Sequence, residues 1–211
     1  MRIINMDSHE HWKSIYTQKD SNKVSWFQEH ADTSLRIIQQ NENNKNAHII
    51  DVGAGASPLV DDLLLAGYKN LEVLDISAEA LAITQDRLGE DQTKIIWHHD
   101  NILDAKLPKH HYDVWHDRAV FHFLTDEEDR TRYIEQVSNA LKSNGKVIIS
   151  TFGPDGPLKC SGLPIVRYDH DTLHNEFGAQ FKLIEHGQED HLTPDGSVQK
   201  FVYCFCKMES N

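Results

Sequence analysis

The stretch from Ile49 to Leu64, IIDVGAGASPLVDDLL, decides the fold of this chain. An apolar run ends in a glycine-rich turn, and a helix-like segment follows it. Gly53 and Gly55 let the backbone turn tightly and approach a ligand closely. Ser57 can cap the following helix, and Pro58 suits its first turn. We therefore predict a strand, a ligand-binding loop and a helix, in that order.

Strand-like and helix-like segments alternate on both sides of this unit. Such alternation predicts a parallel sheet with helices on both faces. The last two strands lack an intervening helix, so we expect an antiparallel hairpin at the sheet edge. The sequence thus predicts an α/β fold with a doubly wound, seven-stranded, mostly parallel sheet and an antiparallel C-terminal hairpin. The expected strands are 47–52, 70–76, 93–100, 112–117, 145–152, 181–189 and 197–206, and the expected helices are 57–67, 77–89, 126–145 and 169–178.

The first 45 residues differ in pattern from the rest. Residues 8–41 are typical of two amphipathic helices joined by a polar loop. Two aromatic residues, Trp26 and Phe27, interrupt that loop, and they suit either a core or a lid. We expect one domain over residues 1–211, with a helical cover at 1–45 and a Rossmann-like core at 46–211.

The composition limits the classes of partner. The formal net charge is −12, and the 21 Lys and Arg residues are scattered, so we expect no nucleic-acid partner. We expect no membrane span, because no apolar run is long enough. The start, MRIINMDSHEHW, lacks the pattern of a signal peptide. The three cysteines are too few for a disulfide framework, which favours reduced thiols and a cytoplasmic location.

The 14 histidines raise the question of a metal site. They cluster as HEH, HHD and KHH, spacings too short for two ligands on one helix face. No C-x-x-C motif accompanies them. We therefore predict no bound metal.

Three features indicate which ligand the glycine loop holds. Asp51 precedes the first glycine, and an acid there would repel a pyrophosphate. Pro58 stands where the dinucleotide fingerprint G-x-G-x-x-G requires its third glycine. Asp75, about twenty residues after Gly55, can bond ribose hydroxyls and suits a nicotinamide cofactor equally well. Together these features favour a cationic ligand with a ribose and no phosphate, such as S-adenosylmethionine, over a nicotinamide cofactor or a purely structural turn.

The segments DVGAGAS, LDIS and HHDNI resemble the first three motifs of the class I S-adenosylmethionine-dependent methyltransferases. The resemblance covers nearly the whole chain from Ile49 onward. Ser57 departs from it, since many members have a third glycine there. The resemblance implies that the methionine moiety would contact Asp51, Gly53, Ala54 and Gly55. The ribose would contact Asp75 and Ile76, and the adenine would contact Asp100, Asn101 and Ile102. Trp26 would belong to the aromatic cover over the cofactor.

The segment WHDRAVFHFL, at the end of the fourth predicted strand, should face the methyl group. Its DRAVF run resembles the D-R-[GA]-A stretch of thiopurine-type S-methyltransferases, and HWKSIY…VSWFQ resembles their aromatic amino-terminal cover. A related D-K-G-T pattern occurs in protein lysine methyltransferases that share this cover. Our first hypothesis is therefore methyl transfer to a small-molecule thiol or other soft nucleophile. A protein lysine methyltransferase is the second, and a cofactor-binding protein without turnover is the third.

Methyl transfer from a sulfonium depends mainly on alignment of the nucleophile, the methyl group and the sulfur. We expect the catalytic residues to be Asp117, Arg118, His116 and His122. Arg118 can stabilise a thiolate or clamp an anion, or it can simply pair with Asp117 or with an acid on the next helix. His116 and His122 can accept a proton or serve as hydrogen-bonded structural residues. An amine acceptor would instead need carboxylates and aromatic walls.

A long loop rich in glycine and proline, 153–167, is a second candidate substrate wall. Cys160 lies within it and is either incidental or a ligand for a soft atom. Cys204 and Cys206 are two residues apart in a strand and should share one face, which favours a place in the core.

Overall fold

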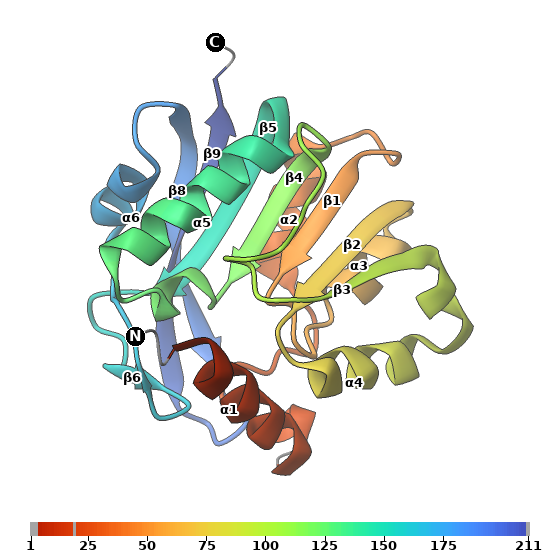
Figure 1. Cartoon of the computed structure of the whole chain (residues 1–211), viewed down its shortest axis with the longest axis vertical. Coiled ribbons are helices and arrows are strands. Elements are labelled where there is room, and N and C mark those ends of the chain that lie inside the picture. The colour runs from red at the N-terminus through yellow and green to blue at the C-terminus, as the bar shows by residue number, and fades with distance from the viewer. Residues whose placement is uncertain (1–3, 19, 210–211) are drawn as a thin grey trace.

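The computed structural model describes residues 4–18 and 20–209. A seven-stranded sheet forms its centre, in the order β3-β2-β1-β4-β5-β9-β8 (Figure 1). Within this sheet only the β5–β9 and β8–β9 pairs are antiparallel, so the predicted sheet and its C-terminal hairpin are confirmed. The strands are β1 His48–Val52, β2 Asn70–Asp75, β3 Ile95–His99, β4 Tyr112–Arg118, β5 Leu141–Phe152, β8 Phe181–Leu192 and β9 Val198–Met208.

Helices cover both faces of this sheet, as the alternation predicted (Figure 1). One apolar core cluster joins the sheet to α5 and α6. A second joins the opposite face to α2, α3 and α4. The helices are α1 Ile4–Gln18, α2 Asp32–Asn41, α3 Leu59–Leu65, α4 Ala78–Leu88, α5 Glu127–Ala140 and α6 His170–Phe177, with short 3-10 turns η1 Ser21–Lys23, η2 Gly89–Lys94 and η3 Phe121–Phe123.

Local capping residues set several of these bounds. Ser77 accepts a hydrogen bond from the Ala80 N–H at 3.2 Å and caps α4 as expected. Gly89 ends that helix at a φ of +57°, a conformation that favours glycine. Ser57 accepts from the Leu59 N–H at 3.2 Å, so α3 begins two residues after the predicted start.

Strand pairing moves further predicted boundaries. The helix expected over 126–145 ends at Ala140, because the chain turns at Leu141 to pair with Tyr112 of β4. β8 continues past 189 to Leu192, since its antiparallel pairing with β9 persists there. His191 therefore belongs to β8.

Smaller elements complete the fold. The loop 153–167 contains a two-stranded hairpin, β6 Lys159–Cys160 and β7 Leu163–Pro164. Cys204 and Cys206 are buried in the core, as expected from their shared face. In the described part of the chain, none of the helices combines the length and apolar character needed to cross a membrane.

Candidate active site

A cavity of about 220 Å³ lies at the carboxyl ends of β1, β2, β3 and β4. Helix α1, drawn in dark red in Figure 1, lies across this edge of the sheet. All the predicted cofactor residues except Gly55 line the cavity, and so do His116 and Arg118. This is the position at which open α/β sheets bind their ligands.

The glycine loop approaches its neighbours too closely for side chains. A Cβ atom on Gly53 would lie 1.9 Å from Cγ2 of Val120, and φ at Gly53 is +63°. A Cβ atom on Gly55 would lie 2.3 Å from the hydroxyl oxygen of Tyr16. The Gly53 N–H donates to the Leu74 carbonyl at 2.7 Å, which ties the loop to β2. At Gly53 the loop therefore presents backbone to the cavity, while Ala54, Ala56 and Ser57 also line it.

Asp75 holds the loop from the end of β2. Its Oδ2 accepts from the Gly55 N–H at 2.7 Å, and its Oδ1 accepts from the Ser77 N–H at 2.8 Å. Burial raises the pKa of Asp75 to about 6, and these two hydrogen bonds oppose that rise. The carboxylate is therefore fixed in orientation at the cavity wall.

Asp51 contributes an unpaired acceptor to the cavity. Its Oδ1 lies 2.6 Å from Nδ1 of His116, whose Nε2 lies 2.8 Å from the Ser34 hydroxyl. Because a carboxylate only accepts, Nδ1 of His116 carries the proton. Oδ2 of Asp51 is buried and has no hydrogen-bond partner among the described residues. An orphaned buried acceptor costs about 1–3 kcal/mol, so a cationic ligand group at this oxygen would be stabilising.

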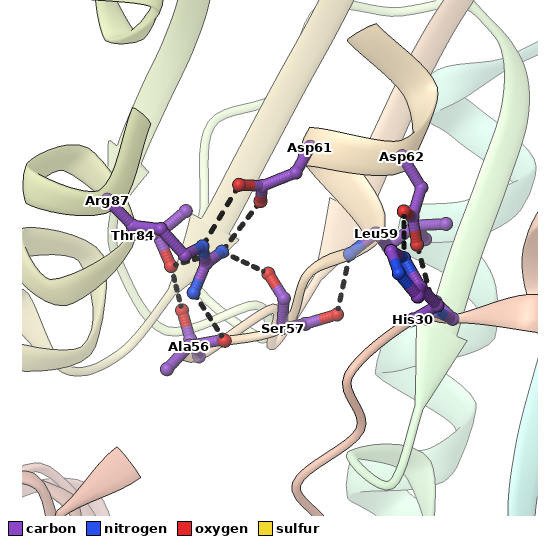
Figure 2. A network of polar contacts seen from close by, with 10 residues as sticks. His30, Ala56, Ser57, Leu59, Asp61, Asp62, Thr84 and Arg87 are labelled. Carbon is purple, nitrogen blue, oxygen red and sulfur yellow. Dashed lines mark hydrogen bonds and ion pairs between the residues drawn. The ribbon is translucent and has the colours of Figure 1, made fainter. Parts of the chain in front are cut away.

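The outer side of the glycine loop is held by α4 (Figure 2). Arg87 donates to the Ala56 and Ser57 carbonyls at 3.0 and 2.8 Å. The same guanidinium forms a two-point contact with the Asp61 carboxylate at 3.0 and 2.7 Å. Thr84 donates to the Gly55 carbonyl at 3.2 Å. These bonds fix the loop without contacting the ligand space.

We expect Arg87→Ala to weaken cofactor binding by roughly fivefold to tenfold, because the loop loses the donors to two of its carbonyls. The Michaelis constant for the cofactor should rise while kcat changes little. Arg36→Ala is the matched control, since Arg36 is a similarly exposed arginine that pairs with Glu185 away from the loop. Equal Michaelis constants in both variants would contradict this positioning role.

Arg118 is already paired. It contacts the Glu189 carboxylate of β8 at 3.3 Å and lies 4.2 Å from the centroid of the Phe201 ring. The partner is thus neither Asp117 nor an acid of the next helix, the two pairings considered from the sequence. Glu189 neutralises the positive charge of Arg118, which would be needed to stabilise a thiolate. The sequence pattern did not indicate that this residue of β8 would be the partner.

Asp117 and His122 do not line the cavity among the described residues. Strand alternation turns Asp117 toward α5, where it accepts from the Tyr133 hydroxyl at 2.6 Å and from the Val120 N–H at 3.0 Å. His122 is fully buried, and burial with the nearby Arg118 charge lowers its pKa to about 3. The Asp117 carboxylate therefore holds the turn after β4, and the His122 ring accepts from the Phe152 N–H of β5 at 3.4 Å.

Aromatic rings form the wall supplied by α1 and the neighbouring loops. The Trp12 ring centroid lies 5.2 Å from that of Phe123 and 5.9 Å from that of Trp26. Tyr16 accepts from the Trp26 indole N–H at 3.3 Å. These four side chains line the cavity, as Cys160 does.

Two carboxylates that the sequence analysis missed also line the cavity, Asp126 and Asp129. They lie immediately before and within the first turn of α5. Both residues belong to the acidic run DEED, but the helix dipole favours acidic residues at the start of any helix. The run alone therefore did not indicate that two of its carboxylates line the cavity.

The comparisons with known proteins agree with this geometry. A family model described as "Methyltransferase domain" matches residues 49–145. EEF1A lysine methyltransferase 2 of Danio rerio is 27% identical over 156 residues, which cover 67% of each protein. N-terminal Xaa-Pro-Lys N-methyltransferase 1 of Xenopus tropicalis is 29% identical over 117 residues, covering 54% of this chain and 52% of the relative.

Solved structures share the fold. A protein from a study of the conversion of a disulfide bond into a thioacetal group during echinomycin biosynthesis superimposes with a TM-score of 0.78 at 13% identity. The superposition covers 96% of this chain and 92% of that one. Fold, domain match and relatives together show that the chain is a class I S-adenosylmethionine-dependent methyltransferase.

Proposed function

We propose that this methyltransferase modifies an amine of a protein substrate, either a lysine side chain or an N-terminal amine. One observation carries the proposal: aromatic rings and carboxylates wall the cavity, while its arginine is neutralised by Glu189. A cavity of this kind suits a cationic ammonium better than an anionic thiolate.

The cofactor would occupy the carboxyl edge of the sheet. The unpaired Oδ2 of Asp51 would accept from the ammonium of the methionine moiety, and the fixed carboxylate of Asp75 would accept from the ribose hydroxyls. Asp100, Asn101 and Ile102 would form the adenine pocket. When bound, S-adenosylmethionine supplies an electrophilic methyl group on a sulfonium.

The acceptor would enter against the aromatic wall. Trp12, Trp26 and Phe123 would stabilise an incoming ammonium through their ring faces and exclude water from it. Asp126 would attract a positively charged segment, with a smaller contribution from Asp129, which also lies 3.5 Å from Arg132. The net charge of −12 would favour the approach of that segment. The aromatic wall would hold the acceptor amine, which would have to give up a proton to solvent before its nitrogen could accept the methyl group that the bound cofactor supplies.

The names of the relatives support the same acceptor. One is named for a lysine of EEF1A and another for the N-terminal amine of Xaa-Pro-Lys. Both names describe methylation of nitrogen on a protein. They favour the lysine hypothesis over the thiopurine-like hypothesis that the DRAVF run suggested.

A small-molecule acceptor is the second candidate. Cys160 and Arg118 line the cavity, as a site for a soft atom would require. A solved structure that superimposes on this chain with a TM-score of 0.69 is a methyltransferase with the small molecule 1,6-didemethyltoxoflavin bound. This candidate requires Arg118 to leave Glu189, which makes it the less favoured one.

The test is transfer of labelled methyl groups into an extract of source cells, followed by separation of proteins from small molecules. We expect label on protein, and at least a tenfold lower rate for the Asp126→Asn/Asp129→Asn variant because two long-range attractions are removed. Glu127→Gln/Glu135→Gln changes the charge of the same helix equally, and these two exposed residues do not line the cavity among the described residues. Label confined to small molecules, or equal loss in both variants, would contradict the proposal.

A further inference from the structure

A buried glutamate lies away from the cavity and has no part in methyl transfer. Glu72 is in β2 on the face that packs against α5, and it is only 4% exposed. Its neighbours on that face, Ile50 and Leu74, are apolar. Burying a carboxylate is costly unless it is paired, so the groups around Glu72 define what it does.

Three histidines from separate parts of the chain surround this carboxylate. Nε2 of His98 lies 2.7 Å from Oε2 of Glu72, and Nε2 of His111 lies 3.2 Å from Oε1. The His48 ring packs edge-to-face on His111, with centroids 4.2 Å apart. Tyr112 donates to Oε2 at 2.8 Å. β1, β3 and the start of β4 thus all contribute to one polar cluster around β2.

We propose that His48, Glu72 and His111 form a zinc site. One ligand atom from each residue lies within 4.8 Å of the others. Two ligands of one tetrahedral zinc are about 3.3 Å apart, given zinc–nitrogen distances of about 2.0–2.1 Å. The 3.2 Å between His111 Nε2 and Glu72 Oε1 matches that separation. Two imidazoles and a carboxylate form a recognised zinc ligand set.

The two oxygens of Glu72 are divided between distinct partners. His98 and Tyr112 donate to Oε2 and fix the carboxylate plane. Oε1 faces His111 and is left for the metal. Such hydrogen bonds around a ligating group orient it and commonly strengthen metal binding. His48 and His111 are partly exposed, so an ion can reach the site from solvent.

The position of the site indicates a structural role. His48 is the first residue of β1, and His111 immediately precedes β4. These two residues are at the amino-terminal ends of their strands, whereas Asp51 and Asp75 lie at the carboxyl ends of β1 and β2. A zinc ion here would link β1, β2 and β4 without contacting the reacting atoms, and it would raise the thermal stability of the chain.

The experiment uses the full chain, freed of metal with a chelator and then titrated with zinc chloride against a chromogenic zinc indicator. We expect one zinc per chain with a dissociation constant on the order of 1 μM or lower. Cobalt chloride should produce visible absorption typical of tetrahedral coordination. His111→Ala and His48→Ala should each weaken zinc binding at least tenfold. Both positions are partly exposed, so these variants should fold.

His186→Ala is the matched control. His186 stacks on His170 with ring centroids 4.0 Å apart, so this is another close histidine pair, placed elsewhere in the fold. Zinc binding that survives both His48→Ala and His111→Ala, or that is lost in His186→Ala, would overturn the assignment. Absence of binding at 100 μM zinc would overturn it as well. Cofactor binding measured on the same samples keeps this result separate from the proposed methyl transfer.

Discussion

Gly53→Ala is expected to lower the affinity for S-adenosylhomocysteine by about 100-fold or more. The added Cβ atom would lie 1.9 Å from Val120 Cγ2, and the backbone at Gly53 has a φ of +63° that alanine adopts at a cost. Relief of the collision must displace either the loop or Val120, and both line the cavity. Isothermal titration calorimetry with S-adenosylhomocysteine measures the loss.

Two variants separate the collision from backbone strain. Gly89→Ala places alanine at a comparable φ of +57° with nothing within 4 Å of its Cβ atom, so it should retain normal cofactor affinity. Gly53→Ala/Val120→Ala removes the 1.9 Å contact but leaves Val120 Cβ at 3.1 Å, so we expect recovery of about tenfold. Normal binding by Gly53→Ala alone would show that the loop does not press against the ligand space.

Asp75→Asn should produce the second large effect, a loss of cofactor affinity of about 30-fold to 100-fold at pH 8. The amide keeps the shape of the side chain, but it loses the charge-assisted acceptor that we assign to the ribose hydroxyls. Calorimetry with S-adenosylhomocysteine again measures the change. Unaltered affinity would remove Asp75 from the proposed cofactor site.

The raised pKa of Asp75, about 6, also predicts a pH dependence. Below that pH the carboxyl is protonated, so the affinity of the unmodified chain should fall as the pH drops through about 6. Stability runs the other way: because the folded pKa exceeds the ordinary value of 3.8, folding favours the protonated form, and this contribution to stability declines as pH rises from about 4 to 6.

Asp75→Asn should remove this pH dependence of cofactor binding and leave a flat, weak affinity. The variant also provides the control, because burial raises the pKa of Asp117 to about 6 as well. A pH dependence that persists in Asp75→Asn would assign the titration to another group such as Asp117.

Sequence reasoning reached the fold because its signals are local. Gly53, Ser77 and Gly89 each mark a turn or a helix end through their own backbone preferences. Motif spacing likewise predicted a ligand loop flanked by Asp51 and Asp75, and both acids line the cavity. The predicted helix end at Gly145 was wrong, because strand pairing with β4, a non-local contact, ends that helix at Ala140.

The partners of the site residues were beyond sequence reasoning because they come from distant elements. Glu189, the partner of Arg118, is 71 residues away in the sequence. Tyr133 donates a hydrogen bond to Asp117 because the alternation of side chains along β4 directs that carboxylate toward α5. The prediction of no bound metal rested on histidine spacing within short segments, whereas the ligands of the proposed zinc site, His48 in β1 and His111 just before β4, are far apart in the sequence.

The most direct test of the central claim is the chemical identity of the methylated residue. After transfer of labelled methyl groups by the full chain into a cell extract, the protein fraction is hydrolysed and its amino acids are separated. The account predicts label in N-methylated lysine or in an N-methylated terminal residue. Label recovered in S-methylcysteine, or only in a small molecule carrying a methylated sulfur, would contradict it and restore the thiol acceptor.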